Sequence, residues 1–170
     1  MFFSIVIPTF NNASFLKKSI KSVENQTYDN FELIVVDNNS TDETSSIIKE
    51  CSIKNLIYEK ISNNGIIAKS RNLGIKLSKG SWLIFLDADD LIYKEKLNFL
   101  NNNLTEDFDL VCTAEKIIDL DSKNYKIWKY GPYENDMYKN MLIHGNKFST
   151  SASVINKDFL IKNKIFFNEN

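Results

Sequence analysis

The feature that most constrains the fold is a short apolar run that stops at a cluster of acids. Residues 82–86 (Trp-Leu-Ile-Phe-Leu) are all apolar, and the run is too short to favour a helix. Strands that are apolar on both faces are typical of parallel sheets covered by helices on each side. The run is therefore predicted to be a central strand whose carboxyl end carries Asp87, Asp89 and Asp90.

The first hundred residues alternate between apolar strands and amphipathic helices. Further strands are predicted over Phe2–Ile7, Phe31–Val36 and Leu56–Ile61, and apolar residues recur at helical spacing after each of them. Such alternation implies right-handed crossovers between parallel strands. The predicted class is an α/β fold with a mainly parallel central sheet and helices on both faces.

Three helix starts can be predicted from capping chemistry. Asn11 or Asn12 precedes the first helical pattern, and Ser40–Glu43 has the Ser-x-x-Glu form of a capping box for the second. Asp90 is predicted to cap a helix that begins near Tyr93.

Polar residues follow four of the predicted strands. Because parallel strands end at one edge of a sheet, Thr9, Asp37, Asn63 and Asp87 to Asp89 are expected to face one crevice. Helix N-termini open onto the same edge and favour anions. This arrangement favours a nucleotide site, although every sheet of this kind has polar loops there.

The acids after residue 86 allow two interpretations. Closely spaced carboxylates suit Mg²⁺ or Mn²⁺, which usually complete their coordination with substrate phosphates. Acids after a strand are also ordinary turn and capping residues. The Asp-x-Asp spacing alone does not decide between them.

Residues 105–170 are less regular than the first part of the chain. Strands are predicted over 108–118, 123–128 and 147–155, and helices over 135–143 and 157–163. Since no linker or repeat divides the chain, residues 1–170 are predicted to form one domain. Its halves are a nucleotide-side half (1–104) and a less regular second half (105–170).

Composition excludes several classes of protein. The chain has 170 residues, 43% hydrophobic and 25% charged, with a formal net charge of −1, so nucleic acid is not an expected partner. No apolar run approaches the roughly 20 residues of a membrane-spanning helix. The N-terminus lacks the features of a signal peptide. We expect a cytoplasmic protein with Cys51 and Cys112 reduced.

Two stretches and a later segment resemble the family 2 glycosyltransferases of GT-A fold. They are residues 4–44 (SIVIPTFNN to VVDNNSTDET), 63–90 (NNGIIAKSRNLG to LDADD) and 148–160 (FSTSASVINKDFL). The resemblance implies a bacterial inverting glycosyltransferase of polysaccharide or lipooligosaccharide synthesis. A hexose or N-acetylhexosamine would pass from a nucleotide-diphosphate donor, a UDP-sugar by preference, to a hydroxyl of a glycan or lipid-linked acceptor.

The same resemblance implies a role for particular residues. Thr9 would meet the nucleobase, Asp37 the base or ribose, and Asp87 the ribose hydroxyls. Asp89 would bind the Mn²⁺ or Mg²⁺ ion that holds the diphosphate. The implied nucleotide-binding residues are Pro8, Thr9, Phe10, Asn11, Asp37, Asn64, Arg71, Asp87 and Ala88.

Arg71 is the only arginine of the chain. Its planar fork could bind phosphate or hold a site carboxylate, and lysine reproduces neither arrangement. The alternative is an ordinary surface ion pair. Ser149–Ser153 is interpreted as an acceptor-side loop, and Trp128 and Tyr130 as lining an acceptor cleft or covering the sheet.

An inverting mechanism needs a general base for the acceptor hydroxyl. The resemblance places that base shortly after a segment like residues 165–170, so we expect it beyond Asn170, together with any parts that contact the inner face of the cytoplasmic membrane. The alternative is a sugar-nucleotide binding module without catalysis. A dehydrogenase is disfavoured because Pro8–Asn12 stands where a glycine-rich loop would be.

Overall fold

The computed structural model describes residues 1–105, 107–119, 121–131 and 136–170. The first half contains β1 (Phe3–Thr9), α1 (Ala13–Glu24), β2 (Phe31–Asp37), α2 (Thr44–Glu50), β3 (Leu56–Lys60), α3 (Ile67–Leu77), β4 (Trp82–Phe85) and α4 (Lys96–Asn103). The second half contains β5 (Leu110–Cys112), β6 (Glu115–Ile118), β7 (Tyr125–Trp128), α5 (Met137–His144), β8 (Ser153–Asn156) and α6 (Lys157–Lys162).

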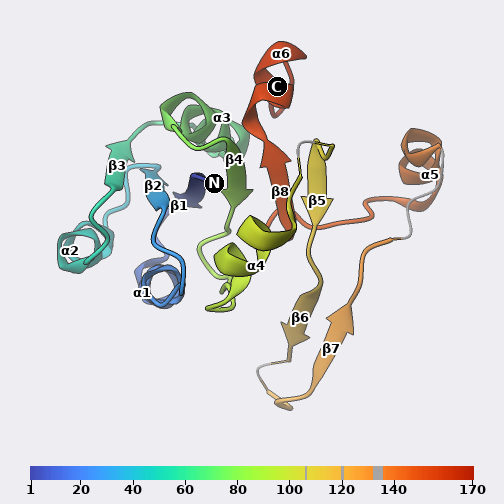
Figure 1. Cartoon of the computed structure of the whole chain (residues 1–170). Helices are drawn as coiled ribbons and strands as arrows, with labels where there is room; N and C mark the ends of the chain where they lie inside the picture. Colours follow the sequence, from blue (N-terminus) through green and yellow to red (C-terminus); the bar gives the residue numbers. More distant parts are fainter. Residues whose placement is uncertain (106, 120, 132–135) are drawn as a thin grey trace.

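A six-stranded sheet with the order β3-β2-β1-β4-β8-β5 forms the centre of the molecule (Figure 1). The strands β3, β2, β1 and β4 are parallel, and β8 runs antiparallel to both β4 and β5. The predicted α/β class with a mainly parallel sheet is confirmed. The register pairs Thr9 with Asp37 and Asp37 with Lys60, so three strands end side by side.

Helices cover both faces of this sheet, as the alternation predicted. On one face, α1, α2 and α4 pack on alternate residues of β1 such as Phe3, Ile5 and Ile7. On the other face, α3 and α6 pack on Val6 and on Phe85 of β4. The central strands are fully buried because both of their faces are covered.

Helix α3 approaches β1 through a glycine. A Cβ atom added at Gly74 would lie 2.2 Å from Cγ1 and 3.0 Å from Cγ2 of Val6. No side chain therefore fits at this position unless Val6 moves. The close contact fixes the distance of α3 from the sheet, and with it the position of the residues that α3 carries.

Two predicted helix caps are wrong. The Ser40 hydroxyl accepts a hydrogen bond from the backbone N–H of Asn11, and α2 begins only at Thr44. Asp90 lies in a turn in which its N–H bonds the carbonyl of Asp87, while α4 begins at Lys96. In both cases the loop after a strand takes up its polar groups before the helix starts.

The second half differs from the prediction in two places. The segment 108–118 is divided between β5 in the main sheet and β6 in a separate hairpin with β7, because the chain leaves the sheet after Cys112. Of the segment 147–155, only β8 is a strand, and the Ser149 hydroxyl accepts a bond from Ala152 N–H in the turn before it. Residue Asn135, predicted to start a helix, lies outside the described residues; α5 is capped by Asp136.

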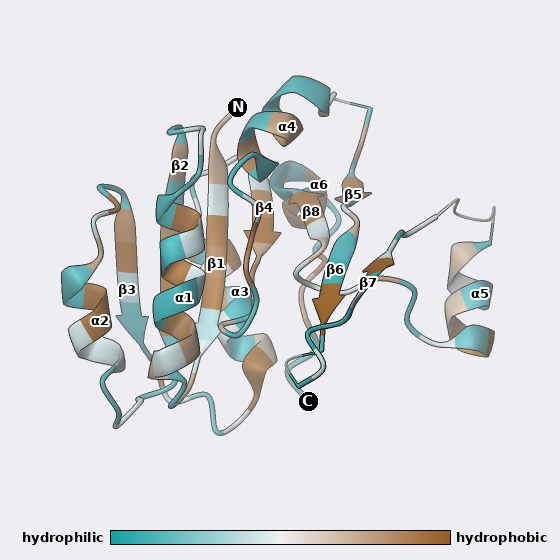
Figure 2. Cartoon of the chain, turned by 90° about the horizontal axis from the view of Figure 1, so that it is seen from below, coloured by the Kyte–Doolittle hydropathy of each residue, from teal (hydrophilic) through white to brown (hydrophobic). Residues whose placement is uncertain are grey.

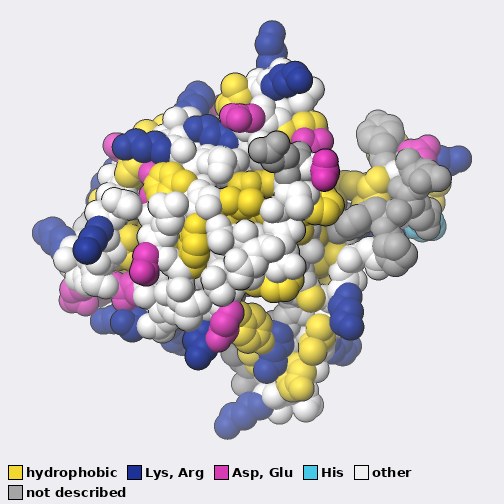
Figure 3. Space-filling view, in the orientation of Figure 1, with side chains coloured by type: hydrophobic (Ala, Val, Ile, Leu, Met, Phe, Trp, Pro, Cys, Tyr) yellow, Lys and Arg dark blue, Asp and Glu magenta, His cyan; other side chains and the backbone are white. Residues whose placement is uncertain are grey.

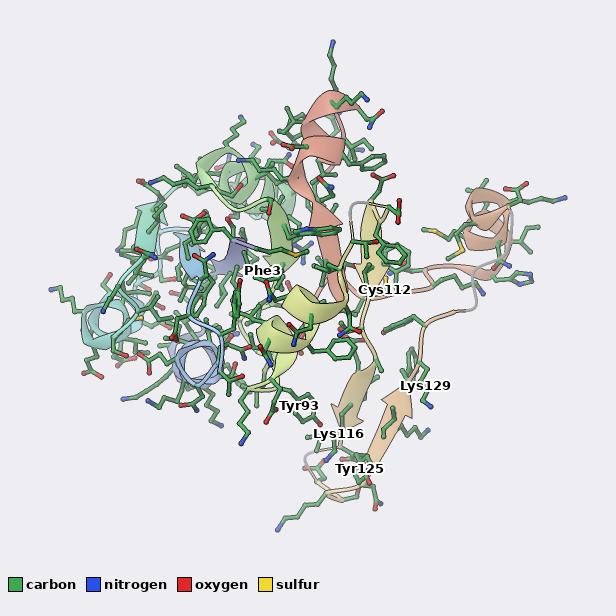
Figure 4. The ribbon with its side chains drawn as sticks, in the orientation of Figure 1. Phe3, Tyr93, Cys112, Lys116, Tyr125 and Lys129 are labelled. Carbon is green, nitrogen blue, oxygen red and sulfur yellow. The ribbon has the colours of Figure 1, made fainter. Side chains whose placement is uncertain are left out.

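The hairpin of β6 and β7 projects from the sheet (Figures 1 and 2). Its strand pairing puts Ile118 and Tyr125 on one face and Ile117 on the other, and all three are about half exposed. Lys116 lies over the Tyr125 ring, 4.0 Å from its centre, and Figure 4 places this pair far from the core residue Phe3. The hairpin is therefore apolar on both of its faces.

Basic and acidic side chains are mixed on the surface of the chain. On the face shown in Figure 3, lysines are interspersed with acids and do not gather in one stripe. Within the described part of the chain, no helix has both the length and the apolar character needed to cross a bilayer. Cys51 and Cys112 are free thiols.

The Gly74 contact makes a stability prediction. Gly74→Ala is expected to lower the free energy of unfolding by about 1–3 kcal/mol, because overpacking against Val6 outweighs the better helix propensity of alanine. Urea titration measures the change. In a Val6→Ala background the same substitution should cost less, because the clashing methyl groups are gone. An equal cost in both backgrounds would contradict the close contact, and Lys76→Ala on the exposed face of α3 is the control.

Candidate functional site

The predicted edge of the sheet exists, and it brings together the loops after β1, β2, β3 and β4. Thr9, Asp37 and Lys60 end the neighbouring strands β1, β2 and β3. Asp87 follows β4, which pairs with β1 on the side opposite to β2. Three asparagines in these loops, Asn11, Asn39 and Asn64, have positive φ angles of 45°, 55° and 55°. Such tight turns keep the loops close to the strand ends.

The loops after β1 and β2 are tied to one another. Asn11 donates its backbone N–H to Ser40 (2.9 Å), and its side-chain carbonyl accepts from Thr41 N–H (2.8 Å). Asn12 occupies the N-cap position of α1, within the predicted pair, but its side chain makes no cap hydrogen bond. Instead, the Asp42 carboxylate accepts from Ala13 N–H at the start of the helix (2.8 Å). The polar groups of this predicted nucleotide-binding segment serve first to fix the loops.

Asp37 is fully buried and already has partners for both carboxylate oxygens. Its Oδ1 accepts from Ser40 N–H (2.8 Å), and its Oδ2 accepts from the Tyr58 hydroxyl (2.6 Å) and lies 3.7 Å from Lys60 Nζ. Burial, and then the hydrogen bond to Asp37, raise the pKa of Tyr58. Asp37 therefore holds β3 and the loop after β2 in place.

A cavity of about 150 Å³ opens beside these loops. Its walls include Pro8, Thr9, Phe10, Asn63, Ile67 and Ser70. The Thr9 hydroxyl is buried and has no hydrogen-bond partner among the described residues. Asn63 is held by bonds to Ser70 and to Gly65 N–H, each 2.8 Å long. The cavity thus combines an apolar wall with a hydroxyl that is still able to bind.

Asn63, and not Asn64, contributes to this cavity. Asn63 is buried, whereas Asn64 is exposed and its side chain accepts a bond from the Ser62 hydroxyl. The exposed Phe10 ring also lines the cavity.

Arg71 and Asp87 form an ion pair at the mouth of the site. Arg71 Nη2 donates to Asp87 Oδ1 at 2.7 Å, and the Arg71 side chain is only 13% exposed. Of the alternatives considered for the single arginine, the structure therefore shows a guanidinium that holds a carboxylate. Arg71 Nε is buried without a hydrogen-bond partner in the described part of the chain.

Asp89 is the acid of this loop that remains free to bind a ligand. It is exposed, and within the described residues its carboxylate has no hydrogen-bond or ion-pair partner, whereas Asp87 is held by Arg71. Ala88 between them is buried in the larger core. The described residues contain no cluster of three or more His, Cys, Asp or Glu side chains around one point. A hard divalent cation would therefore take one or two carboxylates from this loop and fill its other positions with water or phosphate, as Mg²⁺ does.

Ser151, in the turn before β8, is hydrogen-bonded to the acidic loop after β4. Its hydroxyl accepts from Asp87 N–H, and its carbonyl accepts from Lys96 Nζ, each at 3.1 Å. Partial burial and the neighbouring carboxylates of Asp89, Asp87 and Glu115 raise the pKa of Asp90, while a hydrogen bond from Ser151 lowers it. The predicted acceptor-side loop is thus in direct contact with the predicted metal loop.

A second network extends from this turn to the hairpin. Glu115 of β6 accepts hydrogen bonds from the hydroxyls of Ser149 and Tyr130. Burial lowers the pKa of Lys96 to about 8, although the charges of Glu115 and Asp90 act in the opposite direction. Sequence analysis did not identify Lys96 or Glu115, because only the tertiary fold brings them near the acids.

Comparison with known proteins gives a consistent match. The family described as "Glycosyl transferase family 2" matches residues 4–166. The poly(ribitol-phosphate) beta-N-acetylglucosaminyltransferase TarP of Staphylococcus aureus is 41% identical over 105 residues, which are 58% of this chain and 32% of TarP. The chain spans 17% to 20% of the length of the first three curated relatives that it matches.

Solved structures show the same fold. S. aureus TarS 1-349 in complex with UDP-GlcNAc superposes with a TM-score of 0.76 at 24% identity, over 99% of this chain and 49% of that one. A mannosyltransferase from Pyrobaculum calidifontis in complex with GDP-Man and Mn²⁺ superposes with a TM-score of 0.70 at 18% identity, over 99% and 48%.

Asp37→Ala is expected to lower the free energy of unfolding by on the order of 3 kcal/mol, because two donors lose a buried charged acceptor. Tyr58→Phe, which removes one of the two bonds, should cost about 1 kcal/mol. Chemical denaturation measures both. Asp29→Ala, at an exposed acid before β2, is the control. A cost for Asp37→Ala no larger than that of the control would exclude the bracing role of Asp37.

The lowered pKa of Lys96 predicts a pH dependence of stability. Because the folded value of about 8 lies below the usual 10.5, the unfolded chain binds more protons between these values. The contribution of Lys96 to the free energy of unfolding therefore rises with pH across this window. Relative to Lys96→Met, the native chain should gain stability from pH 8 to pH 10. The exposed Lys94→Met is the control, and a pH-independent difference for Lys96→Met would show that folding does not lower the pKa of the Lys96 amine.

Proposed function

Because the chain belongs to glycosyl transferase family 2 and has the GT-A fold, we propose that it binds a nucleotide-sugar donor at the carboxyl edge of β1, β2, β3 and β4 and takes part in sugar transfer. The observation that carries this proposal is the carboxylate of Asp89, which has no partner among the described residues and lies in the same loop as the ion pair of Asp87 and Arg71. The free carboxylate of Asp89 can bind a divalent cation, and the phosphates of a nucleotide ligand can complete the coordination of that cation.

The cavity beside Thr9 is proposed to take the nucleobase. Its walls are Pro8, Phe10 and Ile67 on the apolar side. The polar groups are the side chain of Asn63 and the Thr9 hydroxyl, which has no partner in the described part of the chain. A flat, polar-edged base fits such a wall, because the ring covers apolar atoms and its edge binds the polar groups. Asp37 would act there indirectly, by holding the loop of Asn38 and Ser40.

Asp89 is proposed to be the protein ligand of a Mn²⁺ or Mg²⁺ ion, with Asp87 oriented by Arg71 toward the ribose side. When bound, the ion would stabilise the negative charge that collects on the diphosphate leaving group. TarS binds UDP-GlcNAc, and the P. calidifontis enzyme binds GDP-Man together with Mn²⁺. UDP-GlcNAc or a related UDP-sugar is the donor class that we propose, because the relative TarP is an N-acetylglucosaminyltransferase.

Transfer is proposed to proceed with inversion at the anomeric carbon, with the attacking hydroxyl coming from a glycan or lipid-linked acceptor. The turn of Ser149–Ser153 and the hairpin bearing Glu115 lie on the β8 side of the acidic loop and would form the start of the acceptor side. Binding of the donor and transfer of the sugar are separate properties, so a chain of this length can be tested for the first without the second.

The metal role is tested by the binding of UDP measured by calorimetry with Mn²⁺ and with a chelator. Affinity should be at least about tenfold higher with Mn²⁺, and Asp89→Asn should remove most of this difference, because the cation loses its protein ligand. UMP, which lacks the second phosphate, should gain much less from Mn²⁺ than UDP does.

Asp29→Asn, at the opposite edge of the sheet, is the control and should retain the metal effect. GDP measured in parallel tests the identity of the base. Equal UDP affinity with and without Mn²⁺ would exclude the metal role, whereas tighter binding of GDP than of UDP would replace the proposed donor class.

A further inference from the structure

The last described segment of the chain, Ile165–Glu169, is fastened to α3 by one side chain. Asn72 Nδ2 donates to the carbonyl of Phe167 (2.9 Å) and to Glu169 Oε1 (2.7 Å), and Asn72 Oδ1 accepts from Phe167 N–H (2.9 Å). Asn72 is 4% exposed. A buried amide that makes three bonds to a segment almost a hundred residues away fixes that segment in both position and direction. We call these three bonds the Asn72 clasp.

The clasp brings the ring of Phe167 into contact with both the sheet and Arg71. The ring contacts Phe85 of β4 edge to face, with ring centres 5.0 Å apart. The Arg71 guanidinium carbon lies over the same ring, 5.4 Å from its centre. A guanidinium at this distance over an aromatic face is attracted by the negative charge of that face.

Arg71 is therefore held by two groups, the Phe167 ring and the Asp87 carboxylate. Its Nη2 is bonded to Asp87, and its Nε is buried without a hydrogen-bond partner in the described ranges. If the Phe167 ring moves away, the guanidinium of Arg71 loses this aromatic contact and becomes freer to rotate. The position of the Asp87 carboxylate then depends on a segment that belongs to neither β4 nor its loop.

We infer that Asn72 is a positioning residue: by clasping Ile165–Glu169 to α3 it holds Phe167 against Arg71 and thereby fixes Asp87 at the donor edge. The effect on Asp87 rests on the proposed donor site, but the clasp and its effect on Arg71 do not. Residues 165–169 therefore contribute to the donor site, although they lie at the far end of the described chain.

Because Arg71 is the only arginine, its side-chain Nε–H gives a single arginine signal in a ¹⁵N-correlated NMR spectrum, and no ligand is needed to observe it. A ring over the guanidinium displaces this signal. Asn72→Ala and Phe167→Leu should both move it toward the position of a free arginine. Phe166→Leu changes the neighbouring ring, which is 45% exposed, and should leave the signal in place.

Hydrogen exchange of the same samples tests the clasp directly. Asn72→Ala should speed exchange of the Phe167 amide by about tenfold or more. In the native chain this amide is bonded to Asn72 Oδ1, and the bond must open before the amide can exchange. The central amides of β1 should exchange as slowly in Asn72→Ala as in the native chain. This comparison distinguishes local opening of the clasp from a loss of overall stability. An unmoved Arg71 signal in a folded Asn72→Ala variant would overturn the inference, as would an unchanged Phe167 amide.

Nucleotide binding separates this inference from the proposed function. With Mn²⁺ present, Asn72→Ala and Phe167→Leu should weaken UDP binding by about three- to tenfold, the effect expected from one cation–aromatic contact, and Phe166→Leu by less than about twofold. If the native chain fails to bind UDP, the proposed function is wrong while the NMR result still decides the clasp. If the Arg71 signal moves but UDP affinity does not, the link from Arg71 to the donor edge is overturned.

Discussion

The close contact between Gly74 of α3 and Val6 of β1 is the constraint on which the rest of the site depends. With no side chain between them, α3 lies directly on the parallel sheet. The same helix carries Ser70 to the cavity, Arg71 to Asp87 and Asn72 to the C-terminal segment. Three consecutive residues of a helix point in three directions, so one helix can join the cavity beside Thr9, the acidic loop and the C-terminal segment. A shift of α3 would disturb all three together.

Most motif residues at the edge serve the structure of the loops. The polar groups of Asp37, Ser40 and Asn11 bond to one another and to nearby backbone. Within the described residues, only a few groups, such as the Asp89 carboxylate and the Thr9 hydroxyl, have no partner. The density of internal bonds explains how short loops hold these few free groups in fixed positions. A ligand then meets a site that needs little ordering when it binds.

The sequence was informative where structure is decided by neighbours along the chain. Apolar runs and their polar ends predicted β1 to β4, the parallel sheet, and the edge shared by Thr9, Asp37 and Asp87. Capping failed at Ser40 because its hydroxyl binds the loop after β1, and at Asp90 because its carboxylate is hydrogen-bonded by Ser151 and α4 begins only at Lys96. The roles of Tyr58, Lys96 and Asn72 could not be predicted, since their partners lie at a strand end, in a turn and in the C-terminal segment, which only long-range packing brings near. For the same reason, the division of residues 108–118 between two sheets left no periodic signal.

The order of strands in the central sheet also has a consequence for how the chain reaches this structure. β1 pairs with β2 and with β4, and β2 pairs with β3, all within the first half of the chain. The other side of β4 pairs with β8, which joins Trp82 to Asn156, and β5 pairs only with β8. Pairings between distant segments form slowly, because the loop must close before any contact is gained. During synthesis the first four strands and their helices can therefore assemble while β4 still presents an open edge, which a late antiparallel strand then seals.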